Sequence, residues 1–139
     1  MPMHVHIITP EGTVYDGQAD EITLPTADGE ITVLPHHIPL ITTLIPGAAI
    51  VRLQDKEEYY AVSGGVVEID GKGVQVLAQI ADRAENLQEA AIEKAKADAE
   101  KLVSERRQDA AGFADAVAIL DRELARLKTV RRHRTRRGA

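Results

Sequence analysis

The sequence predicts an α+β fold in which an N-terminal antiparallel β-sandwich of about ten short strands precedes a C-terminal antiparallel two-helix hairpin. In residues 3–77, short aliphatic runs alternate with Gly, Pro and Asp turns, a spacing typical of sandwiches and barrels. After Asp82 proline disappears, alanine becomes frequent, and apolar residues recur at three- and four-residue steps. We therefore expect a β-sandwich domain over residues 1–84 and a helical hairpin with a basic tail over residues 85–139.

The strands are expected from alternation and from the turns that bound them. In residues 3–9, Met3, Val5 and Ile7 face one way and the intervening residues the other, as in a half-buried strand. The Gly64-Gly65 pair interrupts an apolar run, which predicts a bulge or a close backbone approach. Further strands, each next to a Gly, Pro, Asp or polar turn, are expected at residues 13–15, 19–24, 48–53, 58–62, 66–69 and 74–77.

The stretch from residue 28 to residue 47 cannot be helical. Pro35, Pro39 and Pro46 each remove an amide donor and clash with the preceding turn of a helix. Each proline also pushes the residue before it toward extended geometry. With the turn at Gly29, this predicts short strand pieces joined by rigid bends.

The helical unit carries two narrow apolar stripes, separated by a break near residues 104–112. A pair of helices with a short connection packs antiparallel, and stripes rich in alanine bury little surface. The hairpin should therefore need the β-domain or a partner for stability. The tail, Arg131–Arg137, has no apolar pattern and is expected to be solvated when free. The stripes consist of Leu87, Ala91, Ala95, Ala99 and Leu102, and of Phe113, Ala116, Leu120, Leu124 and Leu127.

Composition excludes several classes of function. No run of about 18 apolar residues occurs, no signal-like N-terminus is seen, and the absence of cysteine excludes disulfides and thiolate metal sites. One phenylalanine and no tryptophan give poor support for base stacking, so we expect no nucleic-acid partner. Residues 1–84 hold four Lys/Arg and twelve Asp/Glu (4 − 12 = −8), whereas residues 85–139 hold thirteen and ten (13 − 10 = +3). Such opposite charges suggest two units with different partners.

One enzymatic alternative stays open, a cupin-like metal-binding β-barrel. His4 and His6 with Glu11 and Gly17 come close to a cupin metal motif, in which two histidines and a glutamate hold a divalent ion. The glycine spacing is one residue short, however, and the second cupin motif has no counterpart. A free-standing binding module is a further alternative, disfavoured because the helical hairpin looks weak alone.

No other catalytic or metal constellation stands out in the sequence. His36 and His37 are adjacent, so in a strand their side chains would point to opposite faces. Ser63 lies between a valine and two glycines, where a structural role is favoured. No Gly-rich loop precedes Lys-Ser or Lys-Thr, so a Walker-type phosphate site is absent. We therefore expect no catalytic residue and no metal site.

Four segments in order resemble the epsilon subunit of the bacterial F-type (F1Fo) ATP synthase. They are residues 3–10, 29–47, 62–69 and 76–85, and the helical hairpin is similar in character and length. The second segment holds the most specific pattern, with Gly29-Glu30-Ile31 followed by Val33-Leu34-Pro35, His37 and Pro39-Leu40-Ile41-Thr42. Together these segments are specific, although no single one would be.

The resemblance implies a non-catalytic rotor subunit of the central stalk, whose complex has its active sites on other subunits. Its β-sandwich would bind the gamma subunit and sit on the c-subunit ring during proton-driven synthesis, with Glu30 and His37 matching family residues at the c-ring end. Its hairpin would fold down, or extend along gamma to contact the beta (and alpha) subunits and inhibit ATP hydrolysis. The protein would lie peripherally at the cytoplasmic face of the bacterial cell membrane, attached only through the complex.

The helical part departs from the family's nucleotide-binding pattern. Family members that bind ATP carry Ile/Leu-Asp-x-x-Arg-Ala at the start of the first helix, where this chain has Gln88, Ala91 and Ile92 for the Asp, Arg and Ala. Arg122 and Arg126 match family positions that help to hold the phosphates or meet the beta subunit. Loss of a guanidinium removes a bidentate phosphate contact, so we expect weak or absent ATP binding and no cofactor.

The basic tail is longer than the resemblance leads us to expect. If the extended hairpin meets an acidic surface of beta, the five arginines of residues 131–137 would favour that state in a salt-sensitive way. Cutting the chain after Val130 is then expected to raise the ATPase activity of the assembled enzyme.

Overall fold

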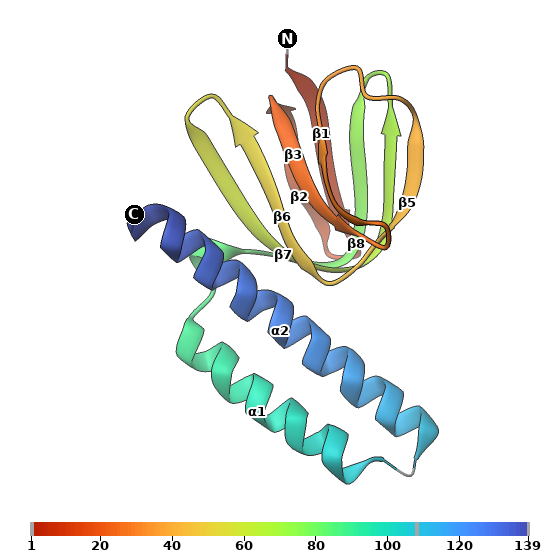
Figure 1. The fold of residues 1–139 in the computed structure, drawn as a ribbon, viewed down its shortest axis with the longest axis vertical. Helices are drawn as coiled ribbons and strands as arrows, with labels where there is room; N and C mark the ends of the chain where they lie inside the picture. Colours follow the sequence, from red (N-terminus) through yellow and green to blue (C-terminus); the bar gives the residue numbers. More distant parts are fainter. Residues whose placement is uncertain (1, 108, 139) are drawn as a thin grey trace.

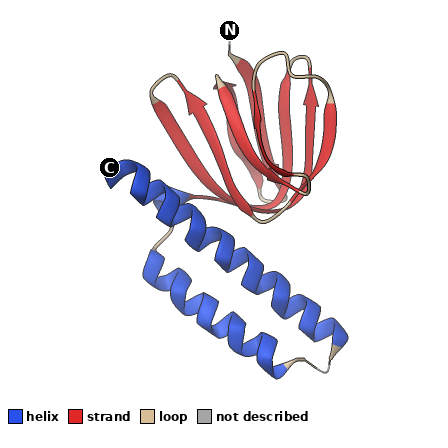
Figure 2. Ribbon diagram, viewed as in Figure 1, coloured by secondary structure: helices blue, strands red, loops and turns tan. Residues whose placement is uncertain are grey.

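The computed structural model describes residues 2–107 and 109–138, without the side chains of residues 136–138, as a strand-rich body followed by two helices (Figures 1 and 2). It confirms the predicted α+β fold, with eight strands in place of about ten. The strands are β1 (Met3–Thr9), β2 (Gly12–Ala19), β3 (Glu21–Thr26), β4 (Gly29–Val33), β5 (Leu40–Leu44), β6 (Gly47–Leu53), β7 (Lys56–Asp70) and β8 (Gly73–Arg83). A 3-10 turn, η1 (Ala84–Asn86), leads into α1 (Glu89–Glu105) and α2 (Ala110–Gly138).

The lower strand count arises mainly at β7, which runs through the Gly64-Gly65 pair without ending. Both glycines have positive φ, 58° and 145°, and the pairing of β7 with β8 keeps one register on both sides of them. A Cβ atom at Gly65 would lie 1.8 Å from the Leu77 carbonyl oxygen. The predicted close backbone approach is therefore present, and only glycine fits it.

Strand β7 connects the two layers of the sandwich. Its first half pairs with β6, from Leu53↔Lys56 to Gly47↔Val62, and its second half pairs with β5, from Leu44↔Gly65 to Leu40↔Ile69. The glycine pair lies where one neighbour replaces the other. Because β7 bends there, one continuous set of strands closes into two layers (Figure 1).

One strand pair departs from the predicted antiparallel arrangement, since β1 and β8 run parallel. The two strands lie far apart in the chain, so their relative direction is set by the path around the sandwich and not by a hairpin turn. The other paired strands are antiparallel: β1 with β2, β3 with β4, β5 and β6, β7 with β5 and β6, and β8 with β7.

The main core lies between the two layers. As predicted, the alternation in β1 buries Met3, Val5 and Ile7 at no more than 5% exposure. The cluster has seventeen buried members, and every one lies in residues 3–78. The sandwich therefore holds its own hydrophobic core without help from the helices.

The helices pack beside the sandwich, and α2 covers part of β6 and β7 (Figures 1 and 2). The predicted hairpin is confirmed, with helices ending and starting at Glu105 and Ala110. The tail differs from the prediction, because α2 continues through it to Gly138. Its Arg136 and Arg137 side chains lie outside the described residues.

Candidate functional site

The loop between β4 and β5 presents apolar side chains on a rigid bend. Pro35 and His36 form its turn, which is closed by the His37 amide donating to the Leu34 carbonyl at 3.2 Å. Proline fixes φ at the first turn position, and His36 has a φ of 67°, the combination of a type II turn. Pro39 then returns the chain to β5. The loop and the first residues of β5 expose four apolar side chains, here called the apolar loop patch: Leu34, Ile38, Leu40 and Ile41.

Two of these side chains, Ile38 at 77% and Ile41 at 71%, are too exposed to stabilise the fold by burial. Scattered exposed apolar residues are ordinary, but four such residues within residues 34–41, at a proline-stiffened loop, indicate a contact surface. A second exposed group lies on the outer face, where Val66 and Leu77 are cross-strand partners and each is about two-fifths exposed.

Glu30 and His37, predicted to share one docking end, lie at opposite ends of β4. Glu30 is the second residue of the strand, and His37 lies beyond its far end in the proline loop. The His37 ring donates from Nδ1 to the Ile38 carbonyl at 2.7 Å. The structure therefore brings Glu30 next to the helices and leaves His37 with the apolar loop patch.

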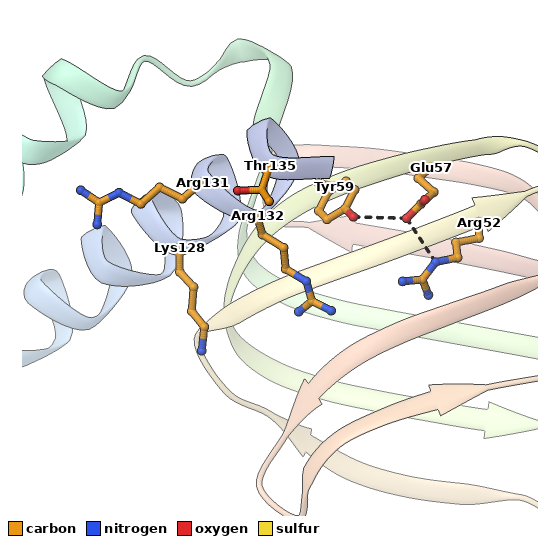
Figure 3. Close-up of a pocket in the computed structure, with 7 residues that line it drawn as sticks. All are labelled: Arg52, Glu57, Tyr59, Lys128, Arg131, Arg132 and Thr135. Atoms are coloured by element: carbon orange, nitrogen blue, oxygen red, sulfur yellow. Dashed lines mark hydrogen bonds and ion pairs between the residues drawn. The ribbon is translucent and has the colours of Figure 1, made fainter. Parts of the chain in front are cut away.

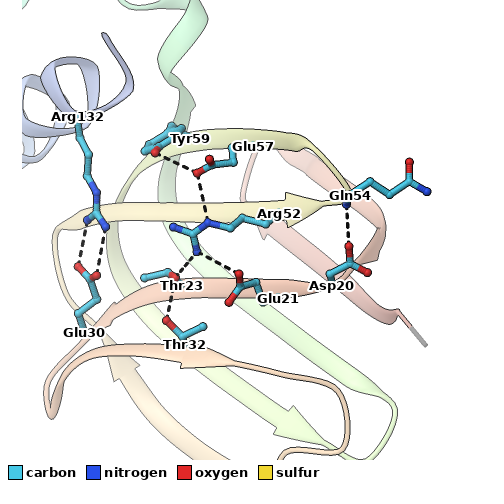
Figure 4. A network of polar contacts seen from close by, with 10 residues as sticks. All are labelled: Asp20, Glu21, Thr23, Glu30, Thr32, Arg52, Gln54, Glu57, Tyr59 and Arg132. Carbon is cyan, nitrogen blue, oxygen red and sulfur yellow. Dashed lines mark hydrogen bonds and ion pairs between the residues drawn. The ribbon is translucent and has the colours of Figure 1, made fainter. Parts of the chain in front are cut away.

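The Glu30 carboxylate is held by helix α2 (Figure 4). Arg132 donates from both terminal nitrogens to the two Glu30 oxygens, at 3.1 and 3.3 Å. Hydrogen bonding from Arg132 has the largest effect on the pKa of Glu30. Together with the charges of Arg132, Lys128 and Arg52, it lowers this pKa from its usual value of 4.5. Glu30 is therefore ionised and engaged at neutral pH.

The histidines of the cupin-like alternative have ordinary partners. His4 donates from Nε2 to Asp16, and His6 shares a hydrogen bond with the Thr13 hydroxyl. Within residues 2–107 and 109–138, no group of three or more His, Cys, Asp or Glu residues is arranged to hold a metal ion. In the same residues, neither helix has the length and apolar character that a membrane crossing requires.

A small apolar cluster joins the hairpin to the sandwich. Ile50, Tyr59 and Ala84 form it on the outer face of β6 and β7, apart from the main core. The Tyr59 ring lies 5.3 Å from the His133 ring of α2, between ring centroids. On α2 the Thr129 side chain is fully buried and donates to the Ala125 carbonyl at 2.7 Å.

Ion pairs surround this cluster. Arg126 donates to Asp82 at 2.8 Å and to Glu123 at 2.7 Å, and the Glu123 side chain is only 6% exposed. Together with the Arg132–Glu30 pair, they tie α2 to the end of β8 and to the start of β4. The contact between hairpin and sandwich is therefore mostly polar at its edges and apolar only at its centre.

An open cavity of about 670 Å³ lies beside this contact, between α2 and strands β6 and β7 (Figure 3). Its cations are largely compensated, since Arg52 donates to Glu57 at 3.2 Å and to Thr23 at 2.8 Å, and Arg132 is held by Glu30. Lys128 and Arg132 extend toward the strands, whereas Arg131 points to the other side of the helix. Three of its four cations are thus paired with carboxylates, whereas Lys128 has no ion pair among the described residues.

A second cavity, of about 350 Å³, lies between the start of α1 and the middle of α2. Gln88, Ala91, Glu123 and Arg126 are among its lining residues. Arg126 is already neutralised by two carboxylates there, and Arg122 has a buried Nε atom without a hydrogen-bond partner in the described residues. The structure thus brings Arg126 to this cavity together with Gln88 and Ala91.

Sequence reasoning missed Arg132 as a site residue. The sequence presents the tail as one basic segment, because no pattern in it separates one arginine from another. Helical spacing supplies the distinction: Arg131 and Arg134 are three residues apart and share a face, while Arg132 lies about 100° further around the helix. Had the helix been extended through the tail, this difference would have been visible.

Known proteins with similar sequences belong to one family of ATP synthase subunits. The family described as ATP synthase, Delta/Epsilon chain, beta-sandwich domain matches residues 2–84. ATP synthase epsilon chains of Nitrosococcus oceani and Alkalilimnicola ehrlichii are each 37% identical to this chain, covering 99% and 96% of both partners. That of Acidithiobacillus ferridurans is 40% identical over 96% of this chain and 94% of its own.

Solved structures share the fold. A chain of the Euglena gracilis mitochondrial ATP synthase, in a structure of OSCP, F1 and c-ring, has a TM-score of 0.75 at 22% identity, covering 86% of this chain and 76% of that one. A central stalk and c-ring structure from Tetrahymena thermophila gives a TM-score of 0.51 at 17% identity, with 62% and 69% coverage. The family match and the near full-length relatives together show that this chain belongs to the epsilon-chain family of ATP synthases.

Proposed function

We propose that this epsilon chain links the gamma subunit to the c ring in the central stalk, and that its hairpin restrains ATP hydrolysis by contacting the beta and alpha subunits. It acts without an active site of its own, and catalysis takes place on other subunits. The chain lies peripherally at the cytoplasmic face of the bacterial membrane and is attached through the complex. Because the chain belongs to the epsilon family, the cupin-like enzyme is set aside.

The observation that carries this function is the apolar loop patch. Ile38 and Ile41 are the two most exposed large apolar side chains of the described residues; Ile38 lies on the loop stiffened by Pro35 and Pro39, and Ile41 lies just after it in β5. A rotating partner needs a surface that transmits torque, and a rigid apolar loop supplies one with little loss of entropy on binding. The solved complexes of similar fold contain a c ring, which supports the same assignment.

The placement of the hairpin supports a separate regulatory role. It packs on the outer face of β6 and β7 with a small apolar cluster, while the main core lies inside the sandwich. Detachment would therefore leave the sandwich intact and still docked. His37 lies with the apolar loop patch and keeps its proposed place in the c-ring contact. Glu30 faces the hairpin in this conformation.

Reconstitution with gamma and the c ring tests both parts. Ile38→Asp places a charge in the apolar loop patch and should reduce co-purification at least about tenfold. The matched control is Leu124→Asp, which introduces the same charge at an exposed leucine of α2 and should leave co-purification unchanged. Removal of residues 88–139 should raise the ATPase activity of the assembled enzyme. Undiminished capture of Ile38→Asp would refute the docking role, and unchanged ATPase activity would refute the inhibitory one.

A further inference from the structure

The contact between Arg132 and Glu30 joins two units that are distant in the sequence. The residues are 102 positions apart, and the pair is bidentate, the geometry in which an arginine–carboxylate contact is strongest. The Arg132 and Glu30 side chains are 35% and 52% exposed, so the pair is open to solvent and sensitive to salt.

The rest of the contact is small enough for this pair to matter. Three buried residues form the apolar cluster between hairpin and sandwich, compared with seventeen in the main core. Where a contact buries little apolar surface, a single ion pair changes its equilibrium measurably. The second pair, Arg126 with Asp82, lies near η1, at the other end of the contact.

Ion pairs of the neighbouring Arg131 and Arg134 orient α2 so that the Arg132 side chain faces the sandwich. Arg131 donates to Glu89 at 2.9 Å and to Glu93 at 2.8 Å, and Arg134 also binds Glu89. These contacts hold the end of α2 against the start of α1, inside the hairpin. With that face occupied by α1, Arg132 is left to face the sandwich (Figure 4).

We propose that Arg132 and Glu30 form an electrostatic latch that keeps the hairpin closed on the sandwich, with Arg131 and Arg134 as positioning residues. The latch opens as ionic strength rises, because both partners are exposed. Its consequence for the enzyme rests on the proposed inhibitory role of the hairpin: the closed state is the uninhibited one. The tail arginines therefore favour the folded hairpin, the reverse of what the sequence alone led us to expect.

The natural absence of cysteine makes a direct distance measurement practical. Spin labels on Asp55→Cys in the β6–β7 turn and Lys101→Cys near the hairpin tip, both exposed, report the separation of sandwich and hairpin in the full chain. The latch variants are Glu30→Arg, Arg132→Glu and the double charge swap. Lys94→Glu reverses an exposed charge of α1 that has no ion pair among the described residues, and serves as the matched control.

Each single reversal should raise the ratio of open to closed hairpin about two- to fivefold or more at low salt. The double swap should restore the closed distance, and the control should not change it. Salt should open the parent chain and have less effect on Glu30→Gln, a milder variant for use if a reversal disturbs the sandwich. An unchanged distance in Arg132→Glu, or failure of the swap to restore closure, would refute the latch. Because the isolated chain is measured, that failure would leave the docking and ATPase tests standing.

Discussion

Gly65 shows at the scale of one residue how the sandwich closes. Its φ of 145° and the 1.8 Å separation between an added Cβ and the Leu77 carbonyl oxygen exclude every other residue type. The glycine lets β7 approach β8 closely at the bend where β5 replaces β6 as its neighbour. Glycine normally weakens a strand, but at position 65 the fold requires it.

Gly65→Ala should lower the free energy of unfolding by more than about 2 kcal/mol, because the backbone must move to admit the methyl group. Gly71→Ala is the matched control, since its added Cβ would meet no atom within 4 Å. The control should stay within about 0.5 kcal/mol of the parent in urea denaturation. Equal stability of the two variants would contradict the close approach.

Closure of the hairpin should depend on pH through the Glu30 carboxylate. The hydrogen bond and charge of Arg132, with the charges of Lys128 and Arg52, lower the pKa of Glu30 in the closed state. A lowered pKa stabilises closure above the usual value of 4.5, and this stabilisation is lost as the pH falls through the lowered pKa. The label distance should lengthen in the parent chain as the pH falls below 4.5, and it should change less in Glu30→Gln. Identical pH profiles would remove Glu30 from the contact.

The 350 Å³ cavity between α1 and α2 leads to a prediction about ATP binding. We expect ATP to show no saturable binding to the isolated chain below about 100 μM in calorimetric titration, because Glu123 and Asp82 already occupy Arg126. Gln88→Asp with Ala91→Arg restores the family residues and should strengthen binding about tenfold or more. Micromolar binding by the parent chain would overturn this expectation.

At the scale of elements, hydrophobic alternation was sufficient to predict most strands and both helices. Alternation identifies the buried face of a strand but not its partner, so the parallel pairing of β1 with β8 could not be inferred. The end of α2 was missed for a different reason. Residues 131–135 carry no apolar stripe, yet arginine is a good helix former, and α1 supplies Glu89 and Glu93 as partners.

The candidate site was predictable only in part. Backbone preferences are local, so bends could be predicted at prolines and glycines: Pro35 lies in the turn after β4, Pro39 lies in the loop before β5, and Gly29, with a φ of 108°, starts β4. The pairing of Glu30 with Arg132 spans 102 residues and depends on how the hairpin docks, which no local pattern contains.

The two units should differ in their ability to fold alone. Residues 1–87 contain the whole main core, so this fragment should keep its β-type circular dichroism and melt cooperatively. Residues 88–139 bury few side chains between Ala-rich helices and should lose much of their helicity when isolated. A fragment of residues 1–87 that is unfolded would show that the hairpin is part of the core structure.

At the scale of the whole molecule, the apolar loop patch and the contact with the hairpin lie on separate parts of the sandwich. The apolar loop patch lies on the bend beyond β4, whereas the ion pairs lie where α2 meets β4 and β8. The acidic β-domain and the basic helical unit attract each other across this contact, which is consistent with their opposite net charges. Docking and regulation can then proceed on separate surfaces of one small chain.

Locking the hairpin in the assembled enzyme tests this account most directly. Glu30→Cys and Arg132→Cys can be joined by a short bifunctional thiol reagent with a reducible spacer, and ATPase activity measured before and after reduction. Closed hairpins should give the activity of enzyme lacking residues 88–139, and reduction should lower it, because the freed hairpin can reach the inhibitory position. Equal activity in the locked and released enzymes would contradict the proposed regulation.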